Sequence, residues 1–279
     1  MVLKKTLTLA GSDTSGGAGL QADLKTFQEY GVYGMTAITS IVAMDPENNW
    51  KHNVFPIDPE IVDKQLACAF STGIDAMKTG MLGSVPIIEL GAKYIDQYHL
   101  ENVVIDPVMV CKGEDEVLLP ETVDASRELL LPRAKVVTPN LFEAWQLSGI
   151  GPIRSLEDMK KAAEKIYDLG PKHVVIKGGR QMGTEKAIDL YFDGTEFTLL
   201  ETEKMDTPYT HGAGCTFAAA ITANLARGQT VFESVLAAKQ FVSAAIQHGW
   251  KLNRFVGPVM HGALHQFRDK APVVTTQKG

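Results

Sequence analysis

Two glycines, Gly212 and Gly214, stand one residue apart in the stretch Thr210–Cys215, just before an apolar, alanine-rich run. That run, Thr216–Ala220, is typical of a helix. The first turn of a helix has unpaired N–H groups and a partial positive charge, so it suits an anion such as phosphate. Cys215 lies where the same field would lower the pKa of a thiol. The stretch therefore predicts an anion site with a reactive side chain, a combination that indicates phosphoryl transfer.

A second glycine-rich stretch, Gly11–Gly19, joins a predicted strand at Thr6–Ala10 to a predicted helix at Leu20–Tyr30. Its glycines do not have the GxGxxG spacing of a dinucleotide-binding loop, and no acidic residue ends a second strand. A flexible turn would contain the same glycines. The polar residues Ser12–Ser15 favour a loop that binds a ligand.

Three polar residues, Asp106, Asn140 and Lys177, each follow a short apolar run that reads as a buried strand. Ligands of a parallel sheet bind beyond the carboxyl ends of its strands, so we expect these side chains to converge on one edge. Lys177 precedes two glycines and could meet a nucleotide phosphate as a point charge, although a surface turn would look the same.

Asn140 and Glu143 are three residues apart at the start of a predicted helix. Both could face a phosphate site that carries a cation. An Asn N-cap with a Glu in the first turn is also ordinary helix chemistry, and the residue types alone favour this simpler interpretation.

The elements that must position these residues follow a βαβ rhythm, in which short apolar runs alternate with longer amphipathic ones. The pattern predicts a late hairpin around Asp193–Thr195, a capped helix start at Ser155, and helices from Cys215 to about Arg227 and from about Val231 to His248. It indicates an α/β fold with a mostly parallel sheet and helices on both faces. We expect a single domain over residues 1–279, because no linker or repeat divides the chain.

Composition excludes several classes of partner. The net charge of -6 argues against nucleic acid, because no basic stripe is available to neutralise phosphates. No window holds the roughly 20 apolar residues that a membrane span needs. The three cysteines form no CxxC motif and no even set, which favours a reducing compartment. We therefore expect a soluble cytoplasmic protein that binds neither nucleic acid nor membrane.

Taken together, the motifs resemble the ribokinase superfamily, and within it the hydroxymethylpyrimidine kinase/pyridoxal kinase branch. They run in family order along nearly the whole chain: Ala10–Gly19 with Gln21–Thr26, Lys78–Leu82, Asp106–Met109, Thr138–Ala144, Lys177–Gly179 and Thr210–Cys215. The resemblance implies a three-layer sandwich and ATP-dependent phosphorylation of a hydroxymethyl group on a nitrogen heterocycle, with Mg²⁺. It also implies a homodimer.

The same resemblance assigns roles to individual residues of this chain. Those expected to line the substrate pocket are Gly11, Asp23, Met44, Met81, Val108 and Cys111, the last in a polar loop that could close over the substrate. Those expected to hold the magnesium–phosphate assembly are Asn140, Glu143 and Asp106. Those expected to meet ATP are Lys177, Gly179, Thr210, Gly212, Gly214 and Lys239, although Lys239 alone reads as a surface lysine.

The wider superfamily has an aspartate base where this chain has Cys215, and the branch it resembles also carries cysteine. Phosphoryl transfer depends mainly on positioning and charge stabilisation, so a weak base can suffice. We hypothesise that Cys215, partly ionised by the helix N-terminus, accepts the hydroxyl proton while Gly212 and Gly214 form the anion hole. His211 has no acidic partner nearby in the sequence, so we expect it to act only by position.

Met44 stands where hydroxymethylpyrimidine kinases typically have a glutamine that can pair with the aminopyrimidine. A thioether cannot make that pairing and offers adaptable apolar contact instead. Losing the amide costs ~1–3 kcal/mol for buried polar atoms. This favours pyridoxal as the substrate, with pyridoxine or pyridoxamine as further ones and a hydroxymethylpyrimidine (phosphate) kinase as the alternative. A nicotinamide-dependent dehydrogenase and a non-catalytic pyridoxal carrier explain fewer of the motifs.

Overall fold

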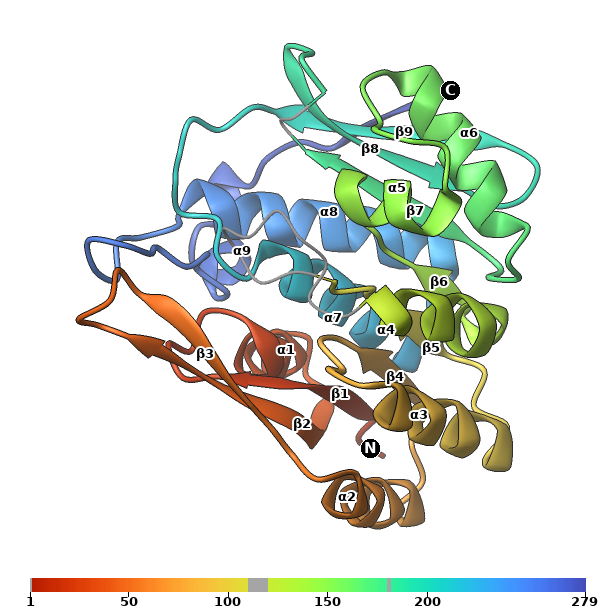
Figure 1. The fold of residues 1–279 in the computed structure, drawn as a ribbon. Coiled ribbons are helices and arrows are strands. Elements are labelled where there is room, and N and C mark those ends of the chain that lie inside the picture. The colour runs from red at the N-terminus through yellow and green to blue at the C-terminus, as the bar shows by residue number, and fades with distance from the viewer. Residues whose placement is uncertain (1, 110–119, 180–181) are drawn as a thin grey trace.

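The computed structural model describes residues 2–109, 120–179 and 182–279, and these residues build one twisted ten-stranded sheet between two layers of helices (Figure 1). The strands are β1 (Lys5–Asp13), β2 (Tyr33–Asp45), β3 (Lys51–Pro56), β4 (Ala76–Thr79), β5 (Val103–Ile105), β6 (Val136–Val137), β7 (Val174–Gly179), β8 (Lys186–Phe192), β9 (Phe197–Glu203) and β10 (Thr275–Lys278). The α-helices are α1 (Gly19–Glu29), α2 (Pro59–Ser71), α3 (Val85–Gln97), α4 (Pro120–Ala125), α5 (Leu141–Ser148), α6 (Leu156–Tyr167), α7 (Ala213–Ala226), α8 (Val231–Gln247) and α9 (Ala263–Gln266).

The sheet has the order β10-β9-β8-β7-β6-β5-β4-β1-β2-β3. The central strands from β7 to β2 run parallel to one another. At one edge β3 pairs antiparallel with β2, and at the other edge β8, β9 and β10 each pair antiparallel with the preceding strand. The predicted, mostly parallel sheet is thereby confirmed. The hairpin around Asp193–Thr195 is also present, because β8 and β9 pair on either side of it.

Alternate residues of the central strands face opposite helical layers. In β5, Val103 and Ile105 pack with the layer that includes α2, α3, α5 and α6, whereas Val104 packs with α7 and α8. Because both faces are covered, the short strands β5 and β6 consist wholly of apolar residues. This arrangement is the predicted three-layer sandwich. The continuity of the sheet supports the single-domain organisation, which remains a prediction.

Local signals in the sequence explain several helix starts. Helix α6 begins with the predicted capping box, in which Ser155 and Asp158 exchange side-chain and backbone hydrogen bonds. Helix α7 is apolar on every side and is buried along almost its whole length, as expected for a helix covered by α1, α8 and the sheet. Among the helices of the described residues, none has the length and hydrophobicity to cross a bilayer.

Candidate active site

A cavity of about 350 Å³ opens beyond the carboxyl ends of the parallel strands. Its wall joins the β1–α1 loop, the β2–β3 hairpin, the ends of β4 to β7 and the first turn of α7. The predicted site residues in this wall are Gly11, Met44, Met81, Asp106, Val108, Asn140, Glu143, Lys177, Thr210, Gly212, Gly214 and Cys215. The topology thus brings together residues that are far apart in the sequence. Cys111, which we expected beside the substrate, lies outside the described residues.

The turn before α7 has the backbone geometry that an anion site requires. Gly212 is the N-cap of α7 with a φ of 81°, a left-handed conformation that favours glycine. A Cβ at Gly212 would lie 1.8 Å from the carbonyl oxygen of Gly17, so no side chain fits there. The N-terminus of this 14-residue helix faces the cavity with Gly212 and Gly214 in the wall. The turn can therefore direct backbone N–H groups at an anion.

Cys215 lies in the first turn of α7, where the backbone N–H of Gly19 acts to lower the pKa of its thiol. Burial raises the pKa of the thiol to about 11, Lys78 opposes this shift, and the carboxylates of Asp23 and Asp106 add to it. The expectation of a lowered thiol pKa is therefore wrong for the protein without ligands. Desolvation and two buried carboxylates outweigh the field of the helix terminus.

Lys177 connects the polar residues that follow β5 and β6. Its Nζ lies 2.9 Å from Oδ1 of Asp106, which is also 3.3 Å from the Thr138 hydroxyl. Asn140 and Glu143 form a capping box, with the two backbone-to-side-chain hydrogen bonds at 2.7 Å and 2.9 Å. The ordinary helix-cap interpretation is thus correct. Both residues also lie in the cavity wall, so their role as a helix cap does not exclude a second role beside a phosphate that carries a cation.

Glu143 is 4% exposed. Burial raises its pKa to about 7, Lys177 opposes the shift and Asp106 adds to it. A carboxylate that remains partly protonated near neutral pH, beside a second carboxylate, is a place where added positive charge is favourable. Among the described residues, no three His, Cys, Asp or Glu side chains come together closely enough to hold a metal ion alone. Mg²⁺ commonly binds through one or two carboxylates together with substrate phosphates and waters, and this donor set fits that mode.

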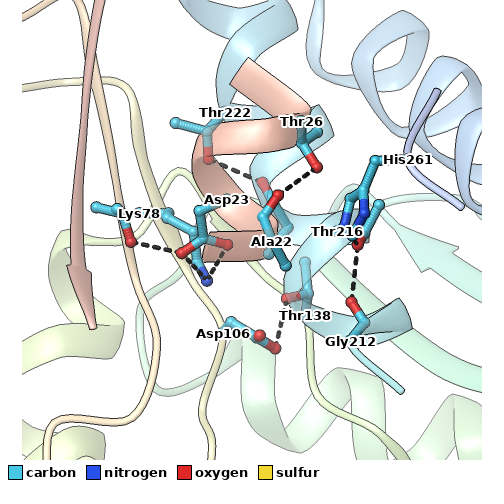
Figure 2. A network of polar contacts seen from close by, with 12 residues as sticks. Ala22, Asp23, Thr26, Lys78, Asp106, Thr138, Gly212, Thr216, Thr222 and His261 are labelled. Carbon is cyan, nitrogen blue, oxygen red and sulfur yellow. Dashed lines mark hydrogen bonds and ion pairs between the residues drawn. The ribbon is translucent and has the colours of Figure 1, made fainter. Parts of the chain in front are cut away.

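Asp23 differs from its expected role, because it is not part of the cavity wall that the described residues form. It is fully buried at the start of α1, where both carboxylate oxygens lie 3.1 Å from Nζ of Lys78 (Figure 2). The hydroxyl of Thr8 donates to it at 2.6 Å. Lys78, in turn, does border the cavity. Asp23 is therefore connected to the cavity through Lys78.

Lys239 and Gly179 also lie outside the cavity wall of the described residues. Lys239 is only 4% exposed, so its default interpretation as a surface lysine is wrong. Its Nζ pairs with Oδ2 of Asp189 at 2.8 Å, and Oδ1 of Asp189 accepts the backbone N–H of Gly179 at 3.2 Å. A buried ion pair thus holds the end of β7, two residues after Lys177.

Four residues of the cavity wall are apolar: Val42 and Met44 from β2, and Met81 and Val108, which follow β4 and β5. Gly11 leaves room for its neighbours, because a Cβ would lie 2.8 Å from the hydroxyl oxygen of Ser40 and 3.0 Å from Cε of Met81, and one of these side chains would have to shift. The structure places Met44 in the wall, as predicted. It also adds His52, which lies opposite Met44 in the pairing of β2 with β3.

Three further polar residues of the wall were missed as ligand or site residues: Asp13, Lys78 and His52. His52 was missed because strand β3 was not predicted. Lys78 stands in a matched motif, but a lysine inside an apolar strand gives no sign of its buried partner. His211 has an acidic partner after all, since Asp13 lies 2.7 Å away although 198 residues separate them.

Comparison with known proteins then identifies the family. The model of the family described as phosphomethylpyrimidine kinase matches residues 13–260. The chain belongs to this family. It is 59% identical to the pyridoxine kinase of Bacillus subtilis over 95% of this chain and 98% of that protein. It is 44% identical to the hydroxymethylpyrimidine/phosphomethylpyrimidine kinase of the same organism, over 94% and 96% of the two chains.

A solved structure shows the same fold in full. The pyridoxal kinase of Staphylococcus aureus in complex with AMP-PCP and pyridoxal superposes with a TM-score of 0.94. The two sequences are 51% identical, and the match covers 100% of each chain. The ribokinase-like sandwich expected from the sequence is confirmed, as is membership of the kinase branch.

Proposed function

We propose that this chain is an ATP-dependent kinase that phosphorylates the hydroxymethyl group of pyridoxal to give pyridoxal 5′-phosphate, and that it also accepts pyridoxine or pyridoxamine. Support comes from relatives named pyridoxine kinase and pyridoxal kinase, the latter solved with AMP-PCP and pyridoxal. The observation that carries the choice of substrate is Met44 in the cavity wall, where a thioether borders the same cavity as the anion turn.

An apolar wall suits a pyridine ring better than an aminopyrimidine. Val42, Met44 and Met81 supply no side-chain donor or acceptor comparable to an amide. The amino group and ring nitrogens of a hydroxymethylpyrimidine would lose hydrogen bonds at this wall, at a cost of about 1–3 kcal/mol per unpaired group. Phosphorylation of hydroxymethylpyrimidine remains the alternative, because a relative at 44% identity carries that name.

The phosphoryl end of the cavity gives each residue a role in this proposal. The N–H groups around Gly212 and Gly214 stabilise negative charge that develops on the transferred phosphoryl group. Lys177 and Thr210 contact the phosphates of ATP, and the Lys239–Asp189 pair holds the Gly179 backbone in place beside them. Phosphoryl transfer needs positioning and charge stabilisation more than covalent chemistry, and these groups provide both.

Cys215 is the group that we propose to accept the hydroxyl proton of the substrate. Its raised pKa means that the thiol is protonated at neutral pH before ligands bind. For Cys215 to accept the hydroxyl proton, the thiol must first release its own proton to solvent water as the ligands bind, and Lys78 favours the resulting thiolate. The alternative role of Cys215 is to orient the hydroxyl as a hydrogen-bond partner.

Mg²⁺ is proposed as the metal, held by Glu143 and Asp106 with the phosphates of ATP, while Asn140 fixes Glu143 through the capping box. When bound, the ion would neutralise charge on the phosphates. Lys177 keeps the Asp106 carboxylate in place, and the buried helix cap holds Glu143 toward the cavity.

A side-by-side assay tests the function. Product formation from pyridoxal, pyridoxine and hydroxymethylpyrimidine is followed with ATP and Mg²⁺, and kcat/KM is compared. We expect pyridoxal to be preferred over hydroxymethylpyrimidine by at least about tenfold, which corresponds to roughly 1.4 kcal/mol. A preference for hydroxymethylpyrimidine would establish the alternative, and ATP-independent binding of pyridoxal without turnover would indicate a carrier.

We also propose a cytoplasmic homodimer. Cys68 is a free, exposed thiol, which suits a reducing compartment. On the edge of the sheet, Phe55 of β3 lies opposite Ile41 of β2, and these side chains are 56% and 43% exposed. A second copy of the chain would cover this apolar edge. Light scattering of wild-type protein and of Phe55→Lys tests it, with a shift toward monomer expected for the variant.

A further inference from the structure

The β1–α1 loop and the turn before α7 pack so closely that two glycines, one in each segment, have no room for a side chain. A Cβ at Gly17 would lie 2.5 Å from Cδ2 of His211, and one at Gly212 would lie 1.8 Å from the carbonyl oxygen of Gly17. The backbone N–H of Gly19, at the start of α1, is near enough to the thiol of Cys215 to act on its pKa. A small sliding of one segment against the other would therefore move Cys215 and the anion turn relative to the substrate loop.

Two polar contacts join the side chains of the two segments at this seam, and Nε2 of His211 makes both of them, the longer one at 3.4 Å to Oγ of Ser15. Nε2 of His211 lies 2.7 Å from Oδ2 of Asp13, and both side chains are 7% exposed. The same carboxylate accepts the backbone N–H groups of Ser15 and Ala18, both at 2.8 Å. Asp13 thus shapes the β1–α1 loop and binds His211 with the same group.

His211 is fixed from its other side as well. Its backbone N–H donates to the carbonyl of Gly257 at 3.1 Å, and its carbonyl accepts the N–H of Val259 at 3.1 Å. The imidazole therefore projects from a segment whose backbone is already paired. Burial raises the pKa of Asp13, but the hydrogen bonds from His211 and Ser15 outweigh it and the net shift is downward. An ionised Asp13 accepts a proton-bearing Nε2, so a neutral imidazole is sufficient for the bond.

We infer that Asp13 and His211 form a positioning pair, which sets the anion turn and Cys215 in register with the loop that borders the substrate. The pair moves no proton in the reaction. It keeps the acceptor hydroxyl and the transferred phosphoryl group within reach of each other, and this inference rests on the proposed kinase function. Loss of the pair should slow the chemical step more than it weakens binding of either substrate.

The test compares two substitutions of the histidine. His211→Leu removes the donor, whereas His211→Gln keeps an N–H that can reach Asp13. We expect kcat of His211→Leu to fall by about 10- to 100-fold, with KM for ATP changed by less than about threefold, because misplacement of about 1 Å can cost 100-fold in rate. His211→Gln should recover most of that loss. The pair His265–Glu29, which lies outside the cavity wall and is partly exposed, supplies the control His265→Leu with unchanged kinetics.

Two further measurements separate this inference from the proposed function and from misfolding. In protein with ¹⁵N-labelled histidine, we expect a slowly exchanging Nε2–H signal of His211 that is lost in Asp13→Asn, whichever heterocycle the enzyme phosphorylates. Thermal unfolding shows whether His211→Leu is folded at the assay temperature. An unchanged kcat in folded His211→Leu, an equal loss in His211→Gln, or a fast-exchanging Nε2 proton in the wild type would each overturn the inference.

Discussion

Nζ of Lys177 lies 2.9 Å from Oδ1 of Asp106, 71 residues earlier in the chain, and this contact joins β7 to the segment that follows β5. Burial lowers the pKa of Lys177, but Asp106 and Glu143 outweigh it and the net shift is upward. The ammonium is therefore a fixed charge between two carboxylates and the cavity. A nucleotide phosphate would add a third anionic partner.

Removal of this charge should weaken nucleotide binding. We expect Lys177→Met to raise KM for ATP by at least about tenfold, since one charged hydrogen bond contributes roughly 1.5–3 kcal/mol. Steady-state kinetics with pyridoxal at saturation measure the effect. Lys186→Met on the neighbouring strand β8 is the matched control, because its partner Glu201 lies outside the cavity wall. An unchanged KM for ATP in Lys177→Met would remove Lys177 from the nucleotide site.

The raised pKa of Glu143 should make the stability of the protein without ligands depend on pH. Its pKa is raised from 4.5 to about 7 in the folded state. Between these values the folded protein binds more protons than the unfolded chain, so the free energy of unfolding falls as pH rises through this window. Glu143→Gln keeps a side chain that can accept the capping bond, and it should be more stable than the wild type at pH 8 by about 1–3 kcal/mol.

Urea unfolding of both proteins at pH 5 and pH 8, without nucleotide or Mg²⁺, measures this difference. The wild type should lose more stability than Glu143→Gln between the two pH values. Parallel behaviour of the two proteins would show that the buried carboxylate is already ionised at pH 5.

Much of the fold could be predicted from the sequence, because hydrophobic periodicity reports burial directly. The strands at Val103, Val136 and Val174 are apolar since both their faces are covered, and the capping box at Ser155 fixed a helix start. Strand β3 was not predicted because its side chains are mostly exposed, so Lys51–Pro56 shows no apolar pattern. His52 was missed for the same reason.

The wall residues of the site were predictable where a glycine turn or a strand end marked them, as at Gly212 and Lys177. Pairings between distant residues were not. Nothing near Asp23 in the sequence indicates that Lys78 neutralises it, and the thiol pKa of Cys215 depends on buried carboxylates from two other segments. The field of the helix terminus can be inferred from the residues next to Cys215, but the desolvation that outweighs it depends on residues far away in the sequence.

Substitution of Met44 should change which heterocycle the enzyme prefers as its substrate. Met44→Gln places an amide in the apolar wall, which should lower kcat/KM for pyridoxal and raise it for hydroxymethylpyrimidine. The ratio of the two values should shift by about 10- to 100-fold toward the pyrimidine, the effect of roughly 1–3 kcal/mol. Met44→Leu is the control and should keep the preference for pyridoxal. A ratio that is unchanged in Met44→Gln would mean that another wall residue selects the substrate.

Substitution of Cys215 should lower turnover, whereas substitution of the other described thiol should not. Cys215→Ala should lower kcat by about 100-fold or more, the contribution expected of a positioned proton acceptor. Cys68→Ala, on the exposed side of α2, should leave kcat unchanged. Single-turnover measurements separate the chemical step from product release. Full activity of Cys215→Ala would leave only the glycine turn as the catalytic feature of this segment.

Removal of one or both charges of the buried pair Asp23–Lys78 should affect stability and activity differently. Burial lowers the pKa of Lys78, but the Asp23 carboxylate outweighs it and the net shift is upward, so the ammonium keeps its charge in a fully buried place, 3.1 Å from both oxygens of Asp23. Asp23→Leu leaves the lysine unpaired and should cost about 3–5 kcal/mol of folding free energy. Asp23→Leu with Lys78→Met removes both charges and should recover most of that stability. It should not recover turnover, because the ammonium that borders Cys215 is gone. Urea unfolding and kcat of the single and double variants measure the two effects, and a double variant with full activity would make the pair purely structural.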